Sequence, residues 1–437
     1  MFKNRLILVF LFVFVDLLGY SLFLPLLPFY AATLGAGPSL VGILVASNAL
    51  AQLIATPIIG RLSDRFGRRP LLIFSICGTL ASFLLLGLVE PLGRSLTALS
   101  SGSITPAAAT VAMLFFTRIL DGLFGGDVSL ARAYVTDITD ERDRAKGLGM
   151  IGAAFGLGFI VGPAIGGTLA NWGYATSAFA AFGLPRYAVP AFAAAALAAL
   201  NLVAVILWLP ESLPPEERSR MAQSPRAAFT ARCLWECLIR PRFGTLLRIR
   251  LLYMLGFTLF TANFALWAQY QLRLTDQATS YVLTYVGIII VLVQGVAIGK
   301  LTNLFSETRL ILAAAMLLTA TLFAWAFVPN LALLLVVITP LPLAGGVLNT
   351  VTNSAITKSV YPEEVGGALG LSASLDSLAR VIAPTIAGVM LQQLGSPSLG
   401  LLGALVTGVM LLHAWRRLIV NPDPALPDRG PEASPPP

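Results

Sequence analysis

The sequence predicts an all-α membrane protein whose twelve transmembrane helices form two pseudo-repeated six-helix bundles. The composition is 57% hydrophobic and only 11% charged, and the mean hydropathy is +0.83. Soluble globular chains carry about a quarter charged residues, so the composition excludes that class. The net charge of +8 does not indicate nucleic-acid binding, because in a membrane chain the distribution of cations matters more than their sum.

Apolar stretches of about twenty residues can cross a ~30 Å hydrocarbon layer as helices. The sequence contains twelve such stretches between polar breaks, predicted at 6–30, 39–59, 71–90, 109–136, 147–170, 188–209, 249–270, 280–302, 308–328, 331–356, 366–392 and 398–418. The first begins with basic residues, as a signal peptide does. Its apolar run continues past Asp16 to Pro28, however, which indicates a retained first span.

A long polar segment divides the spans into six plus six. The predicted organisation is an N-terminal bundle at 1–209, a cytoplasmic linker at 210–248, a C-terminal bundle at 249–420 and a Pro-rich, disordered tail at 421–437. Within the linker, residues 229–247 alternate basic and apolar side chains. This pattern predicts a helix lying at the membrane surface.

The two halves repeat. The segment GRLSDRFGRRPLLI at 60–73 realigns with GKLTNLFSETRLIL at 299–312, and IVGPAIGG at 160–167 realigns with VIAPTIAG at 381–388. A duplicated bundle of this kind places a substrate between the halves, near the bilayer midplane.

The cations predict the orientation. Most of the 29 Lys and Arg residues lie at the termini, in the linker and in the loops that share their side, whereas the opposite loops hold only Arg94, Arg186 and Arg273. We therefore expect both termini in the cytoplasm. The Arg-, Ala- and Pro-rich composition favours a bacterial inner membrane, and we expect a multi-pass monomer in the lipid bilayer.

Five charges are concentrated in GRLSDRFGRRP, between the second and third spans. This predicts a tight hairpin loop at the membrane surface. Its glycines, Gly60 and Gly67, suit sharp turns, and Asp64 can cap a helix or pair with one of three neighbours, Arg65, Arg68 or Arg69.

Charged residues inside membrane spans are costly and are functional candidates by default. Seven occur here: Asp16, Arg118, Asp121, Asp127, Arg132, Asp376 and Arg380. On a continuous fourth helix, Arg118, Asp121 and Arg132 share one face as a polar stripe, and Asp127 points to the opposite side.

Pairing with Arg118 keeps Asp121 ionised, whereas Asp16 has no charged neighbour in its own helix. We therefore expect Asp16 first, and Asp127 second, to exchange protons. The alternative is that Arg118 with Asp121, and Asp376 with Arg380, are static pairs that set helix register. For the second pair, one helical turn apart, the static interpretation is preferred.

The fifth span carries glycines at a spacing of four, which form a smooth face for close helix packing, and Pro163 bends the helix. We expect this face to be a rocking surface between moving parts. The alternative is an ordinary tight helix contact.

Other chemistry has little support. The run GLGMIG at 147–152 fits G-x-G-x-x-G, but no strand precedes it. The chain has a single histidine, His413, and no metal or nucleophile constellation. We therefore expect no cofactor, no metal and no enzyme activity.

The motif GRLSDRFGRRP resembles the signature loop G-x-L-x-D-R-x-G-R-[RK] of the major facilitator superfamily, and nearly the whole chain fits that fold. DLLGYSLFLPLLPFY in the first span resembles the D-x-x-G…P-x-x-P pattern of the tetracycline-resistance-like drug:proton antiporters, which implies that Asp16 is their membrane acid. RILDG is similar to R-x-x-Q-G, which implies a role in proton coupling for Arg118, with Asp121 in place of glutamine. ARAYVTDIT resembles the end of the family's fourth helix, whose acid joins the loop charges in a gating latch, and this implies such a latch of Asp64, Arg68 and Asp137.

In the fifth span the resemblance extends to the antiporter pattern, carried by Gly149, Gly158, Gly162, Pro163, Gly166 and Gly167. The eighth span has Gln294 but no histidine, and the ninth has no acid. Two members of the tetracycline exporters' site are therefore missing, which argues against tetracycline as the substrate.

Together these patterns predict a secondary transporter that alternates between two states. It would export a small amphiphilic molecule in exchange for protons, and the latch would hold the cytoplasmic side closed while the outer side is open. Two alternatives remain. One is a proton-independent facilitator or symporter of a metabolite or lipid, and the other is a non-transporting receptor or scaffold.

Overall fold

A computed structural model describes residues 2–101, 103–175, 184–214, 218, 236–361 and 364–424. Every regular element in these ranges is a helix. Twelve of the helices, some built from two consecutive segments, are long and apolar enough to cross a membrane, which confirms the predicted fold class.

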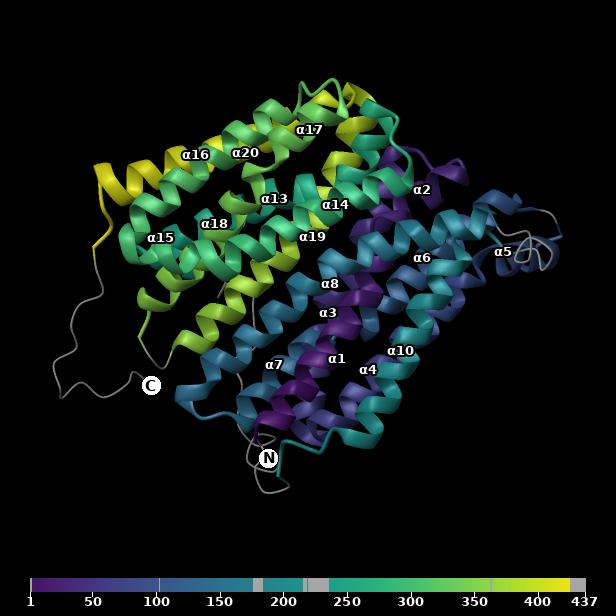
Figure 1. Ribbon diagram of the computed structural model, residues 1–437, viewed down its shortest axis with the longest axis horizontal. Coiled ribbons are helices and arrows are strands. Elements are labelled where there is room, and N and C mark those ends of the chain that lie inside the picture. The colour runs from purple at the N-terminus through teal and green to yellow at the C-terminus, as the bar shows by residue number, and fades with distance from the viewer. Residues whose placement is uncertain are drawn as a thin grey trace.

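The first half contains α1 (Phe2–Phe23), α2 (Leu26–Thr33), α3 (Pro38–Phe66), α4 (Arg68–Gly87), α5 (Val89–Leu99), α6 (Pro106–Phe124), α7 (Asp127–Ile138), α8 (Glu141–Ala175) and α10 (Ala188–Trp208). The second contains α13 (Phe243–Leu272), α14 (Asp276–Leu292), the π-helix η1 (Val293–Ala297), α15 (Ile298–Leu304), α16 (Glu307–Trp325), α17 (Leu331–Ile338), α18 (Pro340–Lys358), α19 (Val365–Leu394), α20 (Pro397–Trp415) and the π-helix η3 (Arg416–Val420). Figure 1 shows the two halves as separate groups of helices, purple to teal and green to yellow.

Two helix boundaries differ from the sequence prediction. The predicted hairpin loop at 60–70 is almost entirely helical, because α3 continues to Phe66 and α4 begins at Arg68. Only Gly67 lies between them, at a φ of 104° that favours glycine. The seventh span begins at Phe243 rather than at 249. The predicted interfacial helix at 229–247 is not continuous: 229–235 lie outside the described residues, 236–239 are helical, and a turn at 240–242 separates them from 243–247, which belong to α13. Most of the predicted disordered tail lies outside the described residues.

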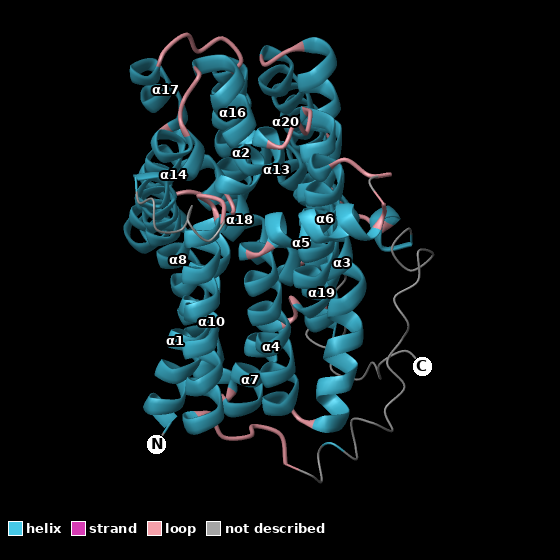
Figure 2. Cartoon of the chain, turned by 90° about the vertical axis from the view of Figure 1, so that its right-hand side faces the viewer, coloured by secondary structure: helices cyan, strands magenta, loops and turns pink. Residues whose placement is uncertain are grey.

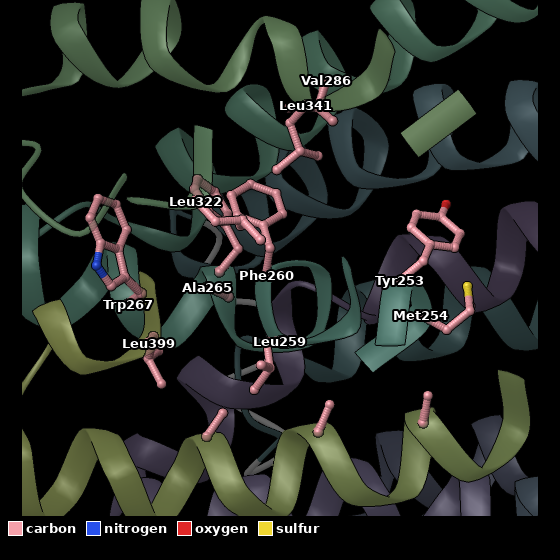
Figure 3. Close-up of a cluster of buried hydrophobic side chains, with 14 of the residues drawn as sticks. Tyr253, Met254, Leu259, Phe260, Ala265, Trp267, Val286, Leu322, Leu341 and Leu399 are labelled. Atoms are coloured by element: carbon pink, nitrogen blue, oxygen red, sulfur yellow. The ribbon is translucent and has the colours of Figure 1, made fainter. Parts of the chain in front are cut away.

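The core of the second half is built around α13, the most deeply buried span (Figure 3). Trp267 and Trp325 are fully buried, with ring centroids 4.9 Å apart, and Phe260 meets Trp325 edge-on at 4.9 Å. Aromatic side chains of this size contribute strongly through buried area and ring geometry. They give the second half an aromatic core of its own.

The halves meet chiefly along two helix pairs, α3 with α19 and α8 with α14, and α2 also contacts α13 and α14. We call the end of the molecule that carries the α3–α4 turn and the start of α1 the terminal end, and the opposite end the far end. Figure 2 shows the α1 N-terminus and α7 together at the terminal end.

Candidate functional site: charged side chains between two helical halves

The halves are in close contact only towards the far end. A Cβ built on Gly42 of α3 would lie 2.3 Å from the Pro384 carbonyl oxygen of α19, and one on Gly167 of α8 would lie 2.7 Å from Ser280 of α14. Contact on the second pair continues to Gly156, whose Cβ would lie 3.0 Å from Val291.

Towards the terminal end, the facing sides of these two helix pairs move apart. A Cβ added to any of a second set of glycines would meet no atom of the described residues within 4 Å. This set is Gly149 and Gly152 of α8, Gly295 and Gly299 in the eighth span, and Gly366, Gly367 and Gly370 of α19. The space between the halves is therefore open at the terminal end and closed at the far end.

The fourth span is broken in the middle. α6 ends at Phe124, Gly125 and Gly126 interrupt the helix, and α7 begins at Asp127. The Gln52 side-chain amide holds the break by donating to the Gly125 carbonyl at 2.6 Å. The break places Asp127 in the first turn of α7, where the helix dipole favours a carboxylate.

Because the fourth span is broken, the prediction that Arg118, Asp121 and Arg132 share one helix face is wrong. Arg118 and Asp121 in α6 are buried, 4% and 6% exposed, whereas Arg132 in α7 is exposed. A helical wheel assumes one continuous axis, and the two glycines remove that continuity.

Asp16 and Asp127 form a carboxyl pair. Asp16 is half-buried on α1 and its side chain is in hydrogen-bonding contact with that of Asp127, which is 4% exposed. The Thr79 hydroxyl lies 3.5 Å from Asp127 Oδ2, and Ser75 also contacts this carboxyl. Two carboxylates that share a site in this way hold together when one of them carries a proton.

Arg118 and Asp121 form the predicted ion pair. Nη1 of Arg118 lies 3.4 Å from Asp121 Oδ2, which also accepts a hydrogen bond of 2.8 Å from Asn48 on α3. Nε and Nη2 of Arg118 are buried and have no hydrogen-bond partner among the described residues. Asp121 Oδ2 therefore has two partners, while Arg118 retains unused donors.

Asp376 does not pair with Arg380. It forms a two-pronged ion pair with Arg250 of α13, at 2.6 and 2.9 Å. Arg250 also donates to the Asn349 side chain on α18 at 2.8 Å and is 4% exposed. The predicted Asp376–Arg380 pair is wrong because Arg250 reaches Asp376 from a neighbouring helix, and Arg380 is left exposed.

Sequence reasoning missed Arg250 as a membrane-embedded residue because it placed the start of the seventh span at 249 and counted Arg250 with the linker cations. The signal that could have found it is the apolar run that begins at Phe243, which places Arg250 two turns into the helix.

Tyr20, Arg132 and Arg380 mark where the halves face each other. The Tyr20 hydroxyl on α1 is within electrostatic range of Arg380 in the second half and of Arg118. Arg132 is likewise within range of Arg380, Asp376 and Arg250. Gln294 is exposed in η1, and π-helical turns inside α-helices are frequent at functional sites.

The residues of the predicted latch are in contact. Arg68 lies 2.7 Å from Asp64 and 2.9 Å from Asp137, and all three belong to the first half. Glu211, which sequence reasoning missed, accepts hydrogen bonds from the backbone N–H groups of Arg68 and Arg69 at the start of α4. A small cavity of about 150 Å³ lies beside this cluster.

Within the described residues none of these contacts reaches the second half, so they do not hold the halves together in this conformation. Arg65 lies over the ring of the neighbouring Phe66, at 5.5 Å from its centroid, and Gly60 has open space beside it.

The glycines of α8 pack mainly inside the first half. Gly158, Gly162 and Gly166 face α1, where the Ser21 hydroxyl donates to the Gly158 carbonyl at 2.7 Å. Pro163 lies within the continuous α8. The expectation that this whole face is a rocking surface is therefore wrong, because only Gly156 and Gly167 touch the second half within the described part of the chain.

Replacing Gly166 with valine should lower stability. A Cβ there would lie 2.0 Å from the Leu22 carbonyl oxygen, a backbone atom that cannot rotate away. Overpacking of this kind costs about 1–3 kcal/mol. Thermal unfolding of purified protein checks this, with Gly149→Ala as the control in open space. An unchanged melting temperature for Gly166→Val would contradict the packing.

Two halves of six membrane-spanning helices, with ionised side chains held between them, define a membrane transporter. The family model of the Major Facilitator Superfamily matches residues 9–306 and 246–436. The chain therefore belongs to the major facilitator superfamily.

Several relatives match over nearly their whole length. The chain is 26% identical to mouse "Solute carrier family 22 member 18", covering 90% of both chains. It is 26% identical to "Multidrug resistance protein 2" of Bacillus subtilis, covering 92% of this chain and 93% of the relative. It is 25% identical to "Tetracycline resistance protein, class H" of Pasteurella multocida, covering 94% and 96%. These matches confirm the resemblance to the tetracycline-resistance-like antiporters.

A solved structure supports the fold. The crystal structure of a mutant of the nucleoside transporter NupG matches with a TM-score of 0.71 at 12% identity, covering 94% of this chain and 99% of that one. At this identity the likeness shows the shared fold.

Proposed function

We propose that this chain exports a small amphiphilic organic molecule in exchange for protons, by alternating access between its two halves. The observation that carries the proposal is the Asp16–Asp127 carboxyl pair, a site that can take up and release a proton inside the membrane. The names of the multidrug and tetracycline resistance relatives support a drug-like cargo and export.

The orientation completes the proposal. The excess of Lys and Arg at the terminal end supports placing that end and both termini in the cytoplasm of a bacterial cell, in the inner membrane. The conformation described above is then open to the cytoplasm. We expect the transporter to work as a monomer, because the space between its own halves supplies the whole site.

Cargo export is coupled to proton entry if the Asp16–Asp127 pair takes up a proton on the outer side and releases it on the inner side. A field of 100 mV across the membrane is worth about 2.3 kcal/mol for each charge that crosses it. Protonation outside and deprotonation inside would therefore drive the empty carrier back. Arg118 and Asp121 remain paired through this step, and the latch of Asp64, Arg68 and Asp137 supports the terminal end when the halves close there.

The test is transport in proteoliposomes with an imposed pH gradient, using a panel of fluorescent amphiphiles. We expect the gradient to drive accumulation by the native protein, and Asp16→Asn to reduce this uphill accumulation at least about tenfold. Exchange of labelled for unlabelled compound, which needs no net proton movement, should persist in the variant.

Glu307→Gln is a matched control, because it also removes one carboxylate but from a surface pair with Lys358 inside the second half. If accumulation by the native protein ignores the pH gradient, the coupling proposal fails and a proton-independent facilitator takes its place. If no compound in the panel crosses at all, a receptor or scaffold role is supported instead.

A further inference from the structure

Two arginines face the open space between the halves without an ion-pair partner among the described residues. Arg132 of α7 and Arg380 of α19 are both exposed, and neither makes an ion pair or a side-chain hydrogen bond with any described residue. They belong to opposite halves and lie within electrostatic range of each other. We propose that they bind an anionic group of the cargo, a carboxylate or sulfonate on an amphiphilic molecule.

The nearby acids make no ion pair with Arg132 or Arg380, because each has a partner of its own. Asp121 is engaged by Arg118 and Asn48, and Asp376 by both prongs of Arg250. Asp16 and Asp127 are hydrogen-bonded to each other. Arg132 and Arg380 therefore keep their full donor capacity for a ligand, and guanidinium groups bind carboxylates in a fork geometry.

A third cation, Arg118, also supports an anion site between the halves. Arg118 has two buried nitrogens, Nε and Nη2, that no described residue accepts from, and it lies within electrostatic range of the Tyr20 hydroxyl. That hydroxyl is also within range of Arg380. Buried donors without partners are rare in folded proteins, so these nitrogens are explained if a ligand or water completes them.

The positions of Arg132 and Arg380 on opposite halves also explain how a bound anionic cargo would help the terminal end to close. Two like charges on opposite halves repel each other as the terminal end closes. An anion between Arg132 and Arg380 converts this repulsion into two attractions. The anionic group therefore acts as the bridge between the halves, and its binding atoms are separate from those that hold the proton.

This inference rests on the proposed function only in taking the ligand as cargo, so its test measures binding without a gradient. The probes are three dansyl compounds that differ in charge: dansylglycine is an anion, its methyl ester is neutral and dansyl-ethylenediamine is a cation. Each is titrated into the purified full-length protein in an uncharged detergent, and dansyl fluorescence polarisation gives the affinity.

We expect dansylglycine to bind at least about tenfold more tightly than its methyl ester, and Arg132→Gln or Arg380→Gln to remove most of that difference. Arg132→Lys and Arg380→Lys should recover part of it, because they restore the charge but not the fork. Arg309→Gln, which removes a cation outside the space between the halves, should leave it unchanged. Unfolding temperatures verify that all variants fold.

Other outcomes overturn the inference. Equal affinity for the three probes, or tighter binding of dansyl-ethylenediamine, rules out an anion site. Loss of dansylglycine binding in Arg309→Gln as well would assign the preference to general surface charge. Competition by short-chain phosphatidylglycerol at lower concentration than dansylglycine would assign the arginines to a lipid headgroup instead of a cargo.

The two proposals fail in different ways. Anion-selective binding that depends on Arg132 and Arg380, without transport driven by a pH gradient, retains the anion site and removes proton coupling. Transport driven by a pH gradient that prefers the cationic probe retains the coupling and removes the anion site.

Discussion

Replacing Arg250 with glutamine is expected to destabilise the protein by about 3–5 kcal/mol, the cost of breaking a buried ion pair from one side. The substitution leaves Asp376 with its negative charge and without its bidentate partner, in a place where the side chain is only 16% exposed. It also removes the donor to Asn349 that ties α13 to α18. Thermal and denaturant unfolding in detergent measure the effect.

The double variant Arg250→Gln with Asp376→Asn is the informative comparison. It removes both charges together, so its destabilisation should be clearly smaller than the sum of the two single effects. Lys358→Gln breaks an exposed pair with Glu307, whose side chains are 68% and 34% exposed, and should change stability by at most about 1 kcal/mol. Additive single effects would show that Arg250 and Asp376 act independently.

Replacing Gly42 with valine should open the far end. A side chain there meets the Pro384 backbone at 2.3 Å, so α3 and α19 must move apart. Overpacking by about 1–3 kcal/mol corresponds to a shift of about 5- to 150-fold in the balance between the two conformations. The far end should separate and the terminal end should close.

Spin-label distances measure this change in a background without the three native cysteines. Labels at the exposed positions Leu99 and Leu331 report the far end, and labels at Arg61 and Leu304 report the terminal end. The first distance should lengthen and the second should shorten in Gly42→Val.

Gly152→Val is the matching test at the opposite end, because it adds the same side chain on the terminal-end side of the contact between the halves. It lies one helical turn from Gly156 on the α8 face that meets α14, and its added side chain enters open space in the present conformation. It should leave both distances unchanged but prevent terminal-end closure, so that transport is lost. Closure of the terminal end in Gly152→Val, or an unchanged far end in Gly42→Val, would contradict this account of the glycines.

Much of the fold could be predicted because membrane burial imposes a simple rule on sequence. Twelve apolar stretches predicted twelve spans, and the Arg118–Asp121 pair and the contacts of Arg68 with Asp64 and Asp137 follow from local spacing and motif. The pairs of Arg118 with Asp121 and of Arg68 with Asp64 join residues in one helix or around one turn, so the sequence carries them directly. The contact of Arg68 with Asp137 joins α4 to α7 and was predicted from the family motif.

Contacts between distant helices could not be predicted in the same way. The pairing of Asp376 with Arg380 was predicted because they lie one helical turn apart, whereas the actual partner, Arg250, is 126 residues away in the chain. The break at Gly125 and Gly126 is held by Gln52 from another helix, so a periodicity argument confined to the fourth span could not include it. The meeting of Asp16 with Asp127 depends on that break and was hidden for the same reason.

The contact of Gly42 with Pro384 and Gly388 lies near one end of α19, so it can act as a pivot about which the rest of that helix tilts. The Gly388 end of α19 is held against α3, and the helix continues from there to Val365 without further contact at its described glycines. At a rise of 1.5 Å per residue this part of the helix is about 35 Å long, so a tilt of about 10° at the pivot moves its other end by roughly 6 Å. A rearrangement of a few tenths of an ångström among small residues at the far end is thereby amplified into a displacement on the scale of a side chain at the terminal end.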